Sequence, residues 1–232
     1  MVQFTLEVYR EIMKKLKNII TNLHTSTQRD YLARMQNDKI NSMKKANNFE
    51  FDYWDGNRNH GYGGYKYDGR WQAVAKKLIK EYNLTNESSI LDVGCGKAFL
   101  LFEIKQILPQ IKIKGFDISK YAIQNAKEEM KPFIFNHKAQ DKYPYNDKEF
   151  DLTLSLNVIH NLKINEIKST LNEIERVSKN AYIVVEGYRN EEELFNLECW
   201  ALTCDSFFRP EEWEWLFKEY NYGGDYEFIY FI

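Results

Sequence analysis

The chain has 232 residues, of which 44% are hydrophobic and 28% are charged, as in an ordinary globular domain with a full core. A net charge of −2 gives no reason to expect nucleic acid or an anionic membrane as a partner. The three cysteines form neither a metal-type cluster nor an even disulfide framework, and no apolar run reaches the roughly 20 residues of a membrane span. We therefore expect a soluble, cytoplasmic protein without a bound metal.

Two helices are predicted at the start of the chain. Residues 2–23 carry apolar side chains at alternating spacings of four and three, the pattern of a helix that packs on another helix. That stripe would lie either on the chain's own domain or on a second copy, so a homodimer through this helix stays open. Residues 29–46 show a second, more polar helical pattern.

The segment 52–71 holds five of the chain's eleven glycines and six aromatic side chains. Glycine at this density cannot continue a helix, so we expect a loop with two Asp-Gly turns. Its aromatic side chains would line a pocket, and its basic ones would bind an anionic small molecule such as a phosphate. The alternative is a compact loop packed by its own tyrosines, with its arginines solvated. The predicted substrate-binding residues of this loop are Tyr53, Arg58, His60, Tyr65, Tyr67 and Arg70.

A nucleoside pocket is predicted after the amphipathic helix of residues 71–82. The apolar run 90–93 is typical of a buried strand, and it leads into a Gly-x-Gly turn at 94–96, where a Cβ would fill the space that a ligand needs. Twenty-one residues beyond Gly96, a second buried run ends in Asp117. In a doubly wound sheet this carboxylate lies at the tip of the neighbouring strand and can accept hydrogen bonds from both ribose hydroxyls.

Two residues discriminate between nucleoside cofactors. Phe99 stands where a dinucleotide fingerprint requires a third glycine, which disfavours NAD(P) and an oxidoreductase. Asp92, inside the turn, suits a cationic ligand better than an anionic one. The segment Leu91-Asp92-Val93-Gly94-Cys95-Gly96, followed by Asp117, resembles the first motif of the class I S-adenosylmethionine-dependent methyltransferases.

This resemblance covers about residues 70–231 and implies S-adenosyl-L-methionine as cofactor, with S-adenosyl-L-homocysteine as product. It also implies that the turn contacts the methionyl part, that Asp117 contacts the ribose, and that residues after the third strand hold the adenine. Which of residues 139–141 takes the adenine position stays open, because one residue is inserted before Pro144. The predicted cofactor-binding residues are Asp92, Gly94, Cys95, Gly96, Asp117, Ile118, Ala139, Gln140 and Asn157.

Strands and helices alternate along the rest of the chain, which predicts an α/β fold with a doubly wound, Rossmann-like and mostly parallel sheet. This methyltransferase domain would span residues 71–232, under a cap of residues 1–70 that contains the helices and the glycine- and tyrosine-rich loop. The last strand is expected to be antiparallel, after a turn at Gly223-Gly224. The remaining predicted strands are 133–136, 151–156, 181–187 and 226–231, and the predicted helices are 98–104, 119–131, 164–178, 191–203 and 210–220.

The resemblance implies methyl transfer from a sulfonium, in which the cofactor supplies the reactivity and the protein brings the acceptor atom into line. A base is needed only where that atom carries a proton. His160, just past the fourth strand, is the candidate catalytic base, with His60 as the second candidate and capping or packing as the alternative role of His160. Glu186 and Tyr188, past the fifth strand, are predicted to face the same crevice and bind the acceptor, although Glu186 could instead cap a helix.

The motifs at residues 53–58 and 61–71, combined with the one at 91–96, resemble a bacterial group of methyltransferases linked to surface-polysaccharide (capsule) biosynthesis. This resemblance implies O-methylation of a small anionic or nucleotide-linked acceptor, such as a nucleotide-activated phosphoramidate. The alternatives are methylation of a free sugar hydroxyl or another small metabolite, and a module that binds the cofactor without turnover.

Overall fold

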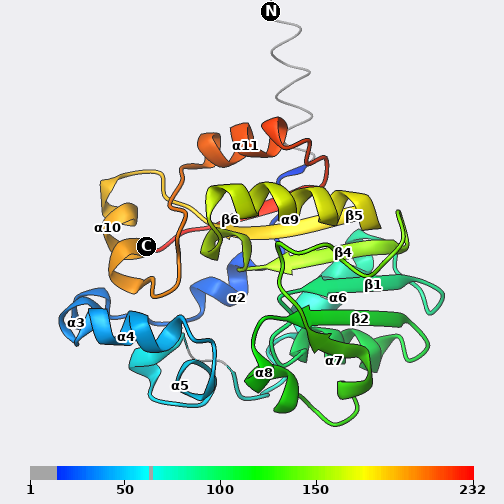
Figure 1. Cartoon of the computed structure of the whole chain (residues 1–232), viewed down its shortest axis with the longest axis horizontal. Helices are drawn as coiled ribbons and strands as arrows, with labels where there is room; N and C mark the ends of the chain where they lie inside the picture. Colours follow the sequence, from blue (N-terminus) through cyan, green and yellow to red (C-terminus); the bar gives the residue numbers. More distant parts are fainter. Residues whose placement is uncertain (1–14, 63–64) are drawn as a thin grey trace, which may run out of the picture.

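The computed structural model describes residues 15–62 and 65–232. Its strands are β1 (Ser89–Val93), β2 (Lys112–Asp117), β3 (Ile134–Asn136), β4 (Phe150–Leu156), β5 (Ser178–Glu186) and β6 (Asp225–Ile229). They form one sheet in the order β3-β2-β1-β4-β5-β6, with every neighbouring pair parallel (Figure 1). The order reverses beside β1, which makes this the switch point where open α/β sheets bind ligands.

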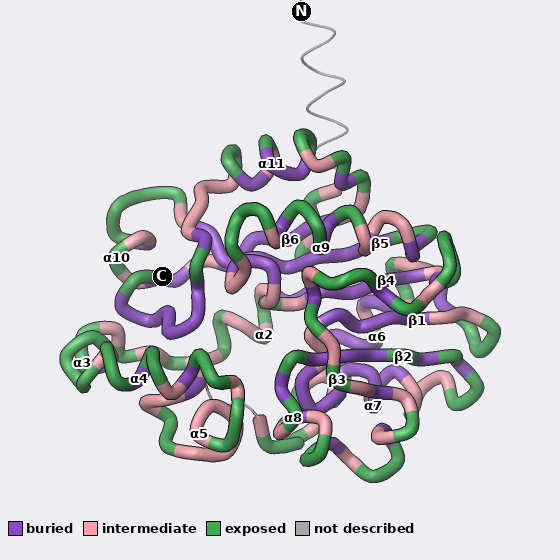
Figure 2. Tube along the Cα trace, in the orientation of Figure 1, coloured by how far each residue is buried: buried purple, intermediate pink, exposed green. Residues whose placement is uncertain are grey.

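Helices cover both faces of this sheet. The helices α6 (Gln72–Glu81) and α7 (Phe99–Ile107) pack on one face, and α9 (Ile164–Val177) and α11 (Pro210–Glu219) pack on the other. Neighbouring residues of a strand point to opposite faces, so Ile90 belongs to the first core and Leu91 to the second. Figure 2 shows the strands buried between these layers. The predicted doubly wound α/β fold is confirmed.

The helix α9 illustrates how the sequence specifies a covering helix. Its buried residues Ile167, Leu171 and Ile174 recur at helical spacing and face the second core. At its N-terminus, the Glu166 carboxylate accepts a hydrogen bond from the backbone amide of Lys163 at 3.0 Å, which satisfies one of the otherwise free backbone donors of the N-terminal turn. The apolar stripe therefore fixes the side that packs, and the acidic residue fixes where the helix begins.

A cap of short helices lies next to the carboxyl ends of the strands. It comprises α2 (Thr21–Thr25), α3 (Tyr31–Gln36), α4 (Lys39–Ala46), α5 (Phe51–Trp54) and the 3-10 helix η1 (Arg58–His60). In Figure 1, α3, α4 and α5 lie below α10 (Glu191–Trp200), against which α3 packs.

Two expectations for this cap are corrected by the structure. The single helix predicted over residues 29–46 is wrong, because Asp38 adopts a left-handed φ of 42° and separates α3 from α4. The loop predicted over residues 52–71 is wrong for α5 and η1, which are short helical turns. Gly56 ends α5 after one turn, where its amide donates to the carbonyl of Phe51 at 2.8 Å.

Most of the helix predicted over residues 2–23, and with it most of the predicted dimer face, lies outside the described part of the chain. Within that part the predicted helix is interrupted, because Leu16 forms a parallel bridge with Tyr226 and α2 begins only later. The buried Glu227 carboxylate holds this segment, since it accepts hydrogen bonds from the amides of residues 19–21 at 2.5 to 3.2 Å. Amides that are bonded to β6 in this way cannot continue a helix.

The edge strand β6 runs parallel to β5, so the antiparallel last strand predicted from the sequence is wrong. The chain leaves β5 and passes through α10 and α11 before it returns, and such a crossover brings it back to the same end of the sheet. The helix predicted over residues 119–131 is also shorter, because α8 spans only Lys120–Gln124. In residues 15–62 and 65–232, none of the helices has both the length and the apolar character required to cross a bilayer.

Candidate active site

A cavity of about 460 Å³ opens at the carboxyl edge of the sheet, where β1, β2, β4 and β5 end, and its volume lies in the range of small-molecule sites. One wall, which we call the cofactor side, contains all nine residues predicted to bind the cofactor: Asp92, Gly94, Cys95, Gly96, Asp117, Ile118, Ala139, Gln140 and Asn157. The wall that we call the aromatic end consists of Arg29, Arg58, Tyr62, Trp200 and Phe231. His160 and Glu186 also line the cavity.

The turn after β1 has a shape that only glycine adopts readily at two positions. Gly94 has a φ of +78° and Gly96 a φ of +53°, which are left-handed values that other residues adopt with strain. A Cβ on Gly94 would lie 2.2 Å from Cγ2 of Val158, and one on Gly96 would lie 2.7 Å from the ring of Trp54. The side chains of Val158 and Trp54 therefore fill the space that the sequence led us to expect for a ligand, and the glycines are required by packing and by backbone shape.

Asp117 joins the end of β2 to this turn. Its two carboxylate oxygens accept hydrogen bonds from the amides of Gly96 and Ser119, each at 2.8 Å. Burial raises the pKa of Asp117 to about 6, while these two amide donors act in the opposite direction. The carboxylate is thus held by backbone at the cavity wall, where its remaining lone pairs can accept from a ligand hydroxyl.

Asp92 is a second buried carboxyl group on the cofactor side. It is 4% exposed at the end of β1. Burial and the nearby Asp117 raise its pKa to about 7. A positively charged ligand group in the cavity would favour its ionised form.

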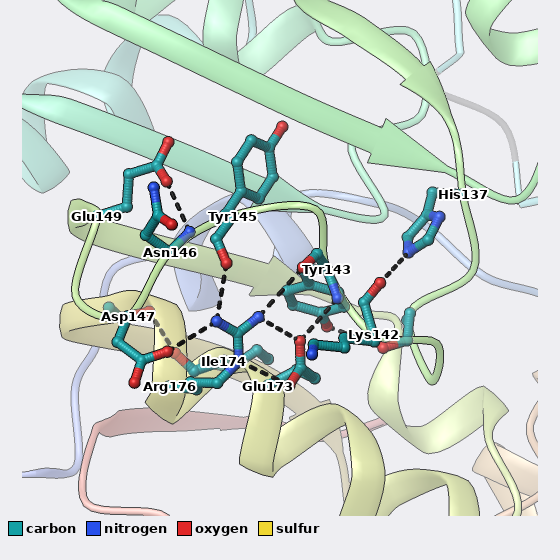
Figure 3. Close-up of polar contacts among 12 residues, drawn as sticks. His137, Lys142, Tyr143, Tyr145, Asn146, Asp147, Glu149, Glu173, Ile174 and Arg176 are labelled. Carbon is teal, nitrogen blue, oxygen red and sulfur yellow. Dashed lines mark hydrogen bonds and ion pairs between the residues drawn. The ribbon is translucent and has the colours of Figure 1, made fainter.

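The loop between β3 and β4 forms the neighbouring part of the cofactor side through Ala139 and Gln140 (Figure 3 shows its anchor). Arg176, at the end of α9, donates to the carbonyls of Tyr143 and Tyr145 at 3.2 and 2.8 Å. The hydroxyl of Tyr143 in turn donates to the carbonyl of Ala139 at 2.8 Å. The loop is thereby fixed to the helical layer beside the cavity.

The cap is fastened to the loops of the cofactor side by a small polar network. The indole of Trp54 donates to the hydroxyl of Ser119 at 2.8 Å. Asp55 pairs with the buried ammonium of Lys97 at 2.7 Å and accepts from the hydroxyl of Tyr121 at 2.8 Å. The cap therefore covers both the turn after β1 and the loop after β2.

His160, the candidate catalytic base, is buried beside the end of β5. Its Nδ1 accepts a hydrogen bond from the backbone amide of Glu186 at 3.1 Å, and its Nε2 lies 3.6 Å from Glu186 Oε2. A backbone amide can only donate, so the ring carries its proton on Nε2. Burial lowers the pKa of His160 to about 3. The ring nitrogen lone pair that a base needs is therefore already occupied.

Glu186 closes the cavity at the end of β5. Its carbonyl accepts a hydrogen bond from the indole of Trp213 at 3.0 Å, which anchors the backbone. Burial raises the pKa of its carboxyl group to about 8, and the Arg29 guanidinium acts in the opposite direction. Among the described residues no group hydrogen-bonds to its Oε2 atom.

Three guanidinium groups lie over the indole of Trp200: those of Arg29 and Arg58, which line the cavity, and that of Arg34, at 4.5 Å from the ring centre. The guanidinium carbon of Arg29 lies 5.5 Å from the ring centre of Trp200 and 5.2 Å from that of Phe231. The guanidinium of Arg58 lies 5.7 Å from the same indole. Nearby His24 is neutral, because burial lowers its pKa to about 4. This end therefore offers aromatic surface together with positive charge.

The residues predicted to bind the acceptor divide between the cavity and its surroundings. Those that line the cavity are Tyr53, Arg58, Tyr65, Arg70 and Glu186. His60 instead contacts Lys45 and Ser42 on α4, at 3.1 and 3.3 Å. Tyr67 packs on α7, and the ring of Tyr188 lies 5.4 Å from the Arg209 guanidinium.

Sequence reasoning did not select three residues that shape the cavity. Arg29 belonged to a helical pattern of polar residues, and Trp200 belonged to the predicted helix 191–203, so neither carried a local signal. Trp54 did carry one, since it stands directly after Tyr53 in the motif that supplied the predicted loop residues. The indole packs against the Gly96 turn, and its position in that motif could have indicated this.

Comparison with known proteins identifies the family. A family described as "Methyltransferase domain" matches residues 84–221, more than half of the chain. The chain belongs to this family. The methyltransferase is also 28% identical over 121 residues to a protein named demethylmenaquinone methyltransferase from Chlorobaculum parvum. That match covers 50% of the methyltransferase and 49% of the relative, so the chain spans about half the length of the curated relatives it matches.

Solved structures of other methyltransferases share the fold. A structure described as a putative methyltransferase from Bacillus halodurans aligns with a TM-score of 0.51 at 16% identity, covering 63% of this chain and 67% of that one. A SAM-dependent methyltransferase from Archaeoglobus fulgidus aligns with a TM-score of 0.50 at 18% identity, covering 64% and 68%.

The cavity fits the cofactor that the family implies. The turn through Gly94, Cys95 and Gly96 lines the cavity. The buried carboxyl groups of Asp92 and Asp117 suit a cationic, ribose-bearing molecule. The chain is an S-adenosylmethionine-dependent methyltransferase domain, and the predicted cofactor is confirmed.

Proposed function

We propose that the methyltransferase methylates an oxygen atom of a small anionic acceptor. The acceptor would be a nucleotide-activated phosphoramidate or a nucleotide-linked sugar of the kind used in capsule biosynthesis. One observation carries this proposal: Arg29 and Arg58 both lie over Trp200 in the same cavity as the cofactor side. Guanidinium groups bind phosphate-like oxygens.

The charges of the lining residues favour a small anionic acceptor over a polyanion. Arg29 and Arg58 supply two positive charges, and Glu186 opposes them when it is ionised. Arg70 contributes less, because its guanidinium is already paired with Asp68, its Nε lying 2.8 Å from Oδ2. A dense polyanion would find too few free cations in this cavity.

The residues of the chain would divide the work of catalysis. The cofactor supplies an electrophilic methyl group on a positively charged sulfur, and its transfer is an in-line displacement. Asp92 would favour binding of the charged sulfur form, and Asp117 would orient the ribose. The aromatic end would hold the acceptor so that its oxygen meets the methyl group, which is the positional contribution that proteins make to such reactions.

A labelled-methyl transfer assay tests this function. The panel contains a nucleotide-linked phosphoramidate, a nucleoside-diphosphate sugar, an uncharged free sugar and demethylmenaquinone, the acceptor named by the relative from Chlorobaculum parvum. We expect transfer to an anionic member, and we expect Arg58→Met to lower kcat/KM for it about 10- to 100-fold through loss of charge-assisted hydrogen bonds. The exposed Lys76→Met variant serves as the control and should retain full activity.

Other results would contradict the proposal in distinct ways. Transfer only to the free sugar or to demethylmenaquinone would show that the arginines do not select the acceptor. Cofactor binding without transfer to any member would favour a module that binds the cofactor without turnover.

A further inference from the structure

Two buried polar atoms of residues in the cavity wall, one a hydrogen-bond donor and one an acceptor, have no hydrogen-bond partner among the described residues. Among the described residues, four buried side-chain nitrogen or oxygen atoms have no hydrogen-bond partner. Two of the four, Arg29 Nε and Glu186 Oε2, belong to residues that line the cavity. Buried polar groups are normally paired, so this pair points to a ligand that accepts a hydrogen bond from one and donates a hydrogen bond to the other.

A hydroxyl group on an otherwise anionic molecule meets both requirements. An anionic oxygen could accept from Arg29 and from the protonated form of Glu186, but it has no proton to give to the ionised form. A hydroxyl could donate to Glu186 Oε2 while another oxygen of the same molecule accepts from Arg29. Only a hydroxyl acceptor can therefore use the ionised Glu186 carboxylate as a proton acceptor.

We propose that Glu186 is the catalytic base, that its Oε2 accepts the proton of an acceptor hydroxyl, and that Arg29 binds a hydrogen-bond-accepting oxygen of the same acceptor. His160 is then a positioning residue, because its Nδ1 is bonded to the Glu186 amide and its Nε2 proton faces the Glu186 carboxylate. This inference rests on the proposed function and narrows it to hydroxyl acceptors.

The transfer step balances with no further reactant. The O–H bond of the acceptor breaks and its proton moves to the Glu186 carboxylate. The acceptor oxygen forms a bond to the methyl carbon, and the electron pair of the breaking carbon–sulfur bond stays on the sulfur, which becomes a neutral thioether. One positive and one negative charge disappear together, so a buried site carries no new charge after the step.

The groups around Glu186 support a proton acceptor at this position. The titratable and charged groups that face it are Arg29, His160, Tyr62 and Cys204. Burial raises the pKa of both Tyr62 and Cys204, so neither supplies a competing negative charge. Burial also raises the pKa of Glu186 to about 8, which is close to the value at which a carboxylate is an effective base near neutral pH.

Glu186→Gln is the test variant, because glutamine keeps the shape and loses the proton acceptor. We expect kcat for the nucleoside-diphosphate sugar to fall about 100- to 10,000-fold, while calorimetry shows S-adenosylmethionine binding unchanged within about threefold. Glu198→Gln, on the exposed side of α10, is the matched control and should keep full activity. A deoxy analogue that lacks the methylated hydroxyl should not accept a methyl group.

A second measurement follows the protonation state of Glu186 in the absence of enzymatic turnover. The difference between the infrared spectra of the wild type and of Glu186→Gln should show a protonated carboxyl band at low pH. This band should disappear as the pH rises, with a midpoint near the Glu186 pKa of about 8. His160→Ala should shift this midpoint and the matching limb of the pH profile of kcat. Its effect on kcat should also be smaller in the Glu186→Gln background than in the wild type, as expected for coupled residues.

Three outcomes would overturn the inference. The first is full activity of Glu186→Gln on a hydroxyl acceptor. The second is transfer to a phosphorus-bound oxygen of the phosphoramidate that Glu186→Gln leaves intact, and this result would preserve the proposed function. The third is the absence of transfer to any panel member, which would remove the proposed function together with the inference.

Discussion

The cofactor side and the aromatic end of the cavity are built in different ways. On the cofactor side the shape comes from backbone, because bare glycines form the turn and two amides hold both oxygens of Asp117. At the aromatic end the shape comes from side chains, such as Arg29, Arg58 and Trp200, which distant segments of the chain bring together.

This difference separates two functions. A site made of backbone tolerates little change, because each substitution alters the turn itself. A site made of side chains can exchange one group at a time without disturbing the fold. We therefore expect the cofactor side to be sensitive to single substitutions and the aromatic end to control the choice of acceptor.

Replacing Gly94 by alanine should produce the largest effect. The added Cβ meets Val158 at 2.2 Å and the φ of +78° is unfavourable for alanine, so the free energy of unfolding should fall by about 2–5 kcal/mol and cofactor binding should be lost. Gly69→Ala is the matched control, because Gly69 has the same φ of +78° and no atom within 4 Å of its Cβ position. Urea unfolding and calorimetry check both variants, and equal losses would show that the packing against Val158 does not matter.

The pH dependence of cofactor binding should show the next largest effect. Asp92 has a pKa of about 7 in the free protein, and a cationic ligand favours its ionised form, so binding should release a proton as the pH falls below 7. The dissociation constant of S-adenosylmethionine should therefore rise about tenfold between pH 8 and pH 6.

Calorimetry at the two pH values checks this prediction. Asp92→Asn should remove most of the dependence, since the amide does not titrate. A wild-type affinity that is equal at both values would contradict the assignment of Asp92 to the cationic part of the cofactor.

Breaking the contact between the cap and the cofactor side should have the smallest effect on stability and on cofactor affinity. Lys97→Met removes the partner of Asp55, which is 22% exposed and keeps its hydrogen bond from Tyr121. The free energy of unfolding should fall by about 1 kcal/mol, and cofactor affinity should fall about threefold. Lys131→Met, which breaks an exposed pair with Glu128, is the control, and a drop of equal size there would argue against a fastening role.

The sequence allowed prediction of most of the cofactor side because its residues are local. The turn at 94–96 follows a buried strand directly, and Asp117 ends the next strand, so two short segments and the rules of parallel sheets place these residues together. The same logic placed β2 beside β1. It failed for β6, because the direction of an edge strand depends on the path of the chain through α10 and α11.

The aromatic end could not be predicted because its contacts join residues far apart in the chain. Arg29 and Trp200 are separated by 171 positions (200 − 29), and no local pattern links them. The sequence also could not predict that the lone pair of His160 is occupied, because this depends on a hydrogen bond from the backbone amide of Glu186. The basic residues of the loop at 52–71 led us to expect an anion-binding pocket, but the position of each charge required the fold.

The account depends most directly on Asp117 holding the cofactor ribose. Calorimetric titration of S-adenosylmethionine into the wild type, Asp117→Ala and Asp141→Ala tests this, with Asp141 as an exposed control in the loop beside the cavity. We expect micromolar binding to the wild type and to Asp141→Ala, and no measurable binding to Asp117→Ala. Binding of equal strength to all three proteins would contradict the account.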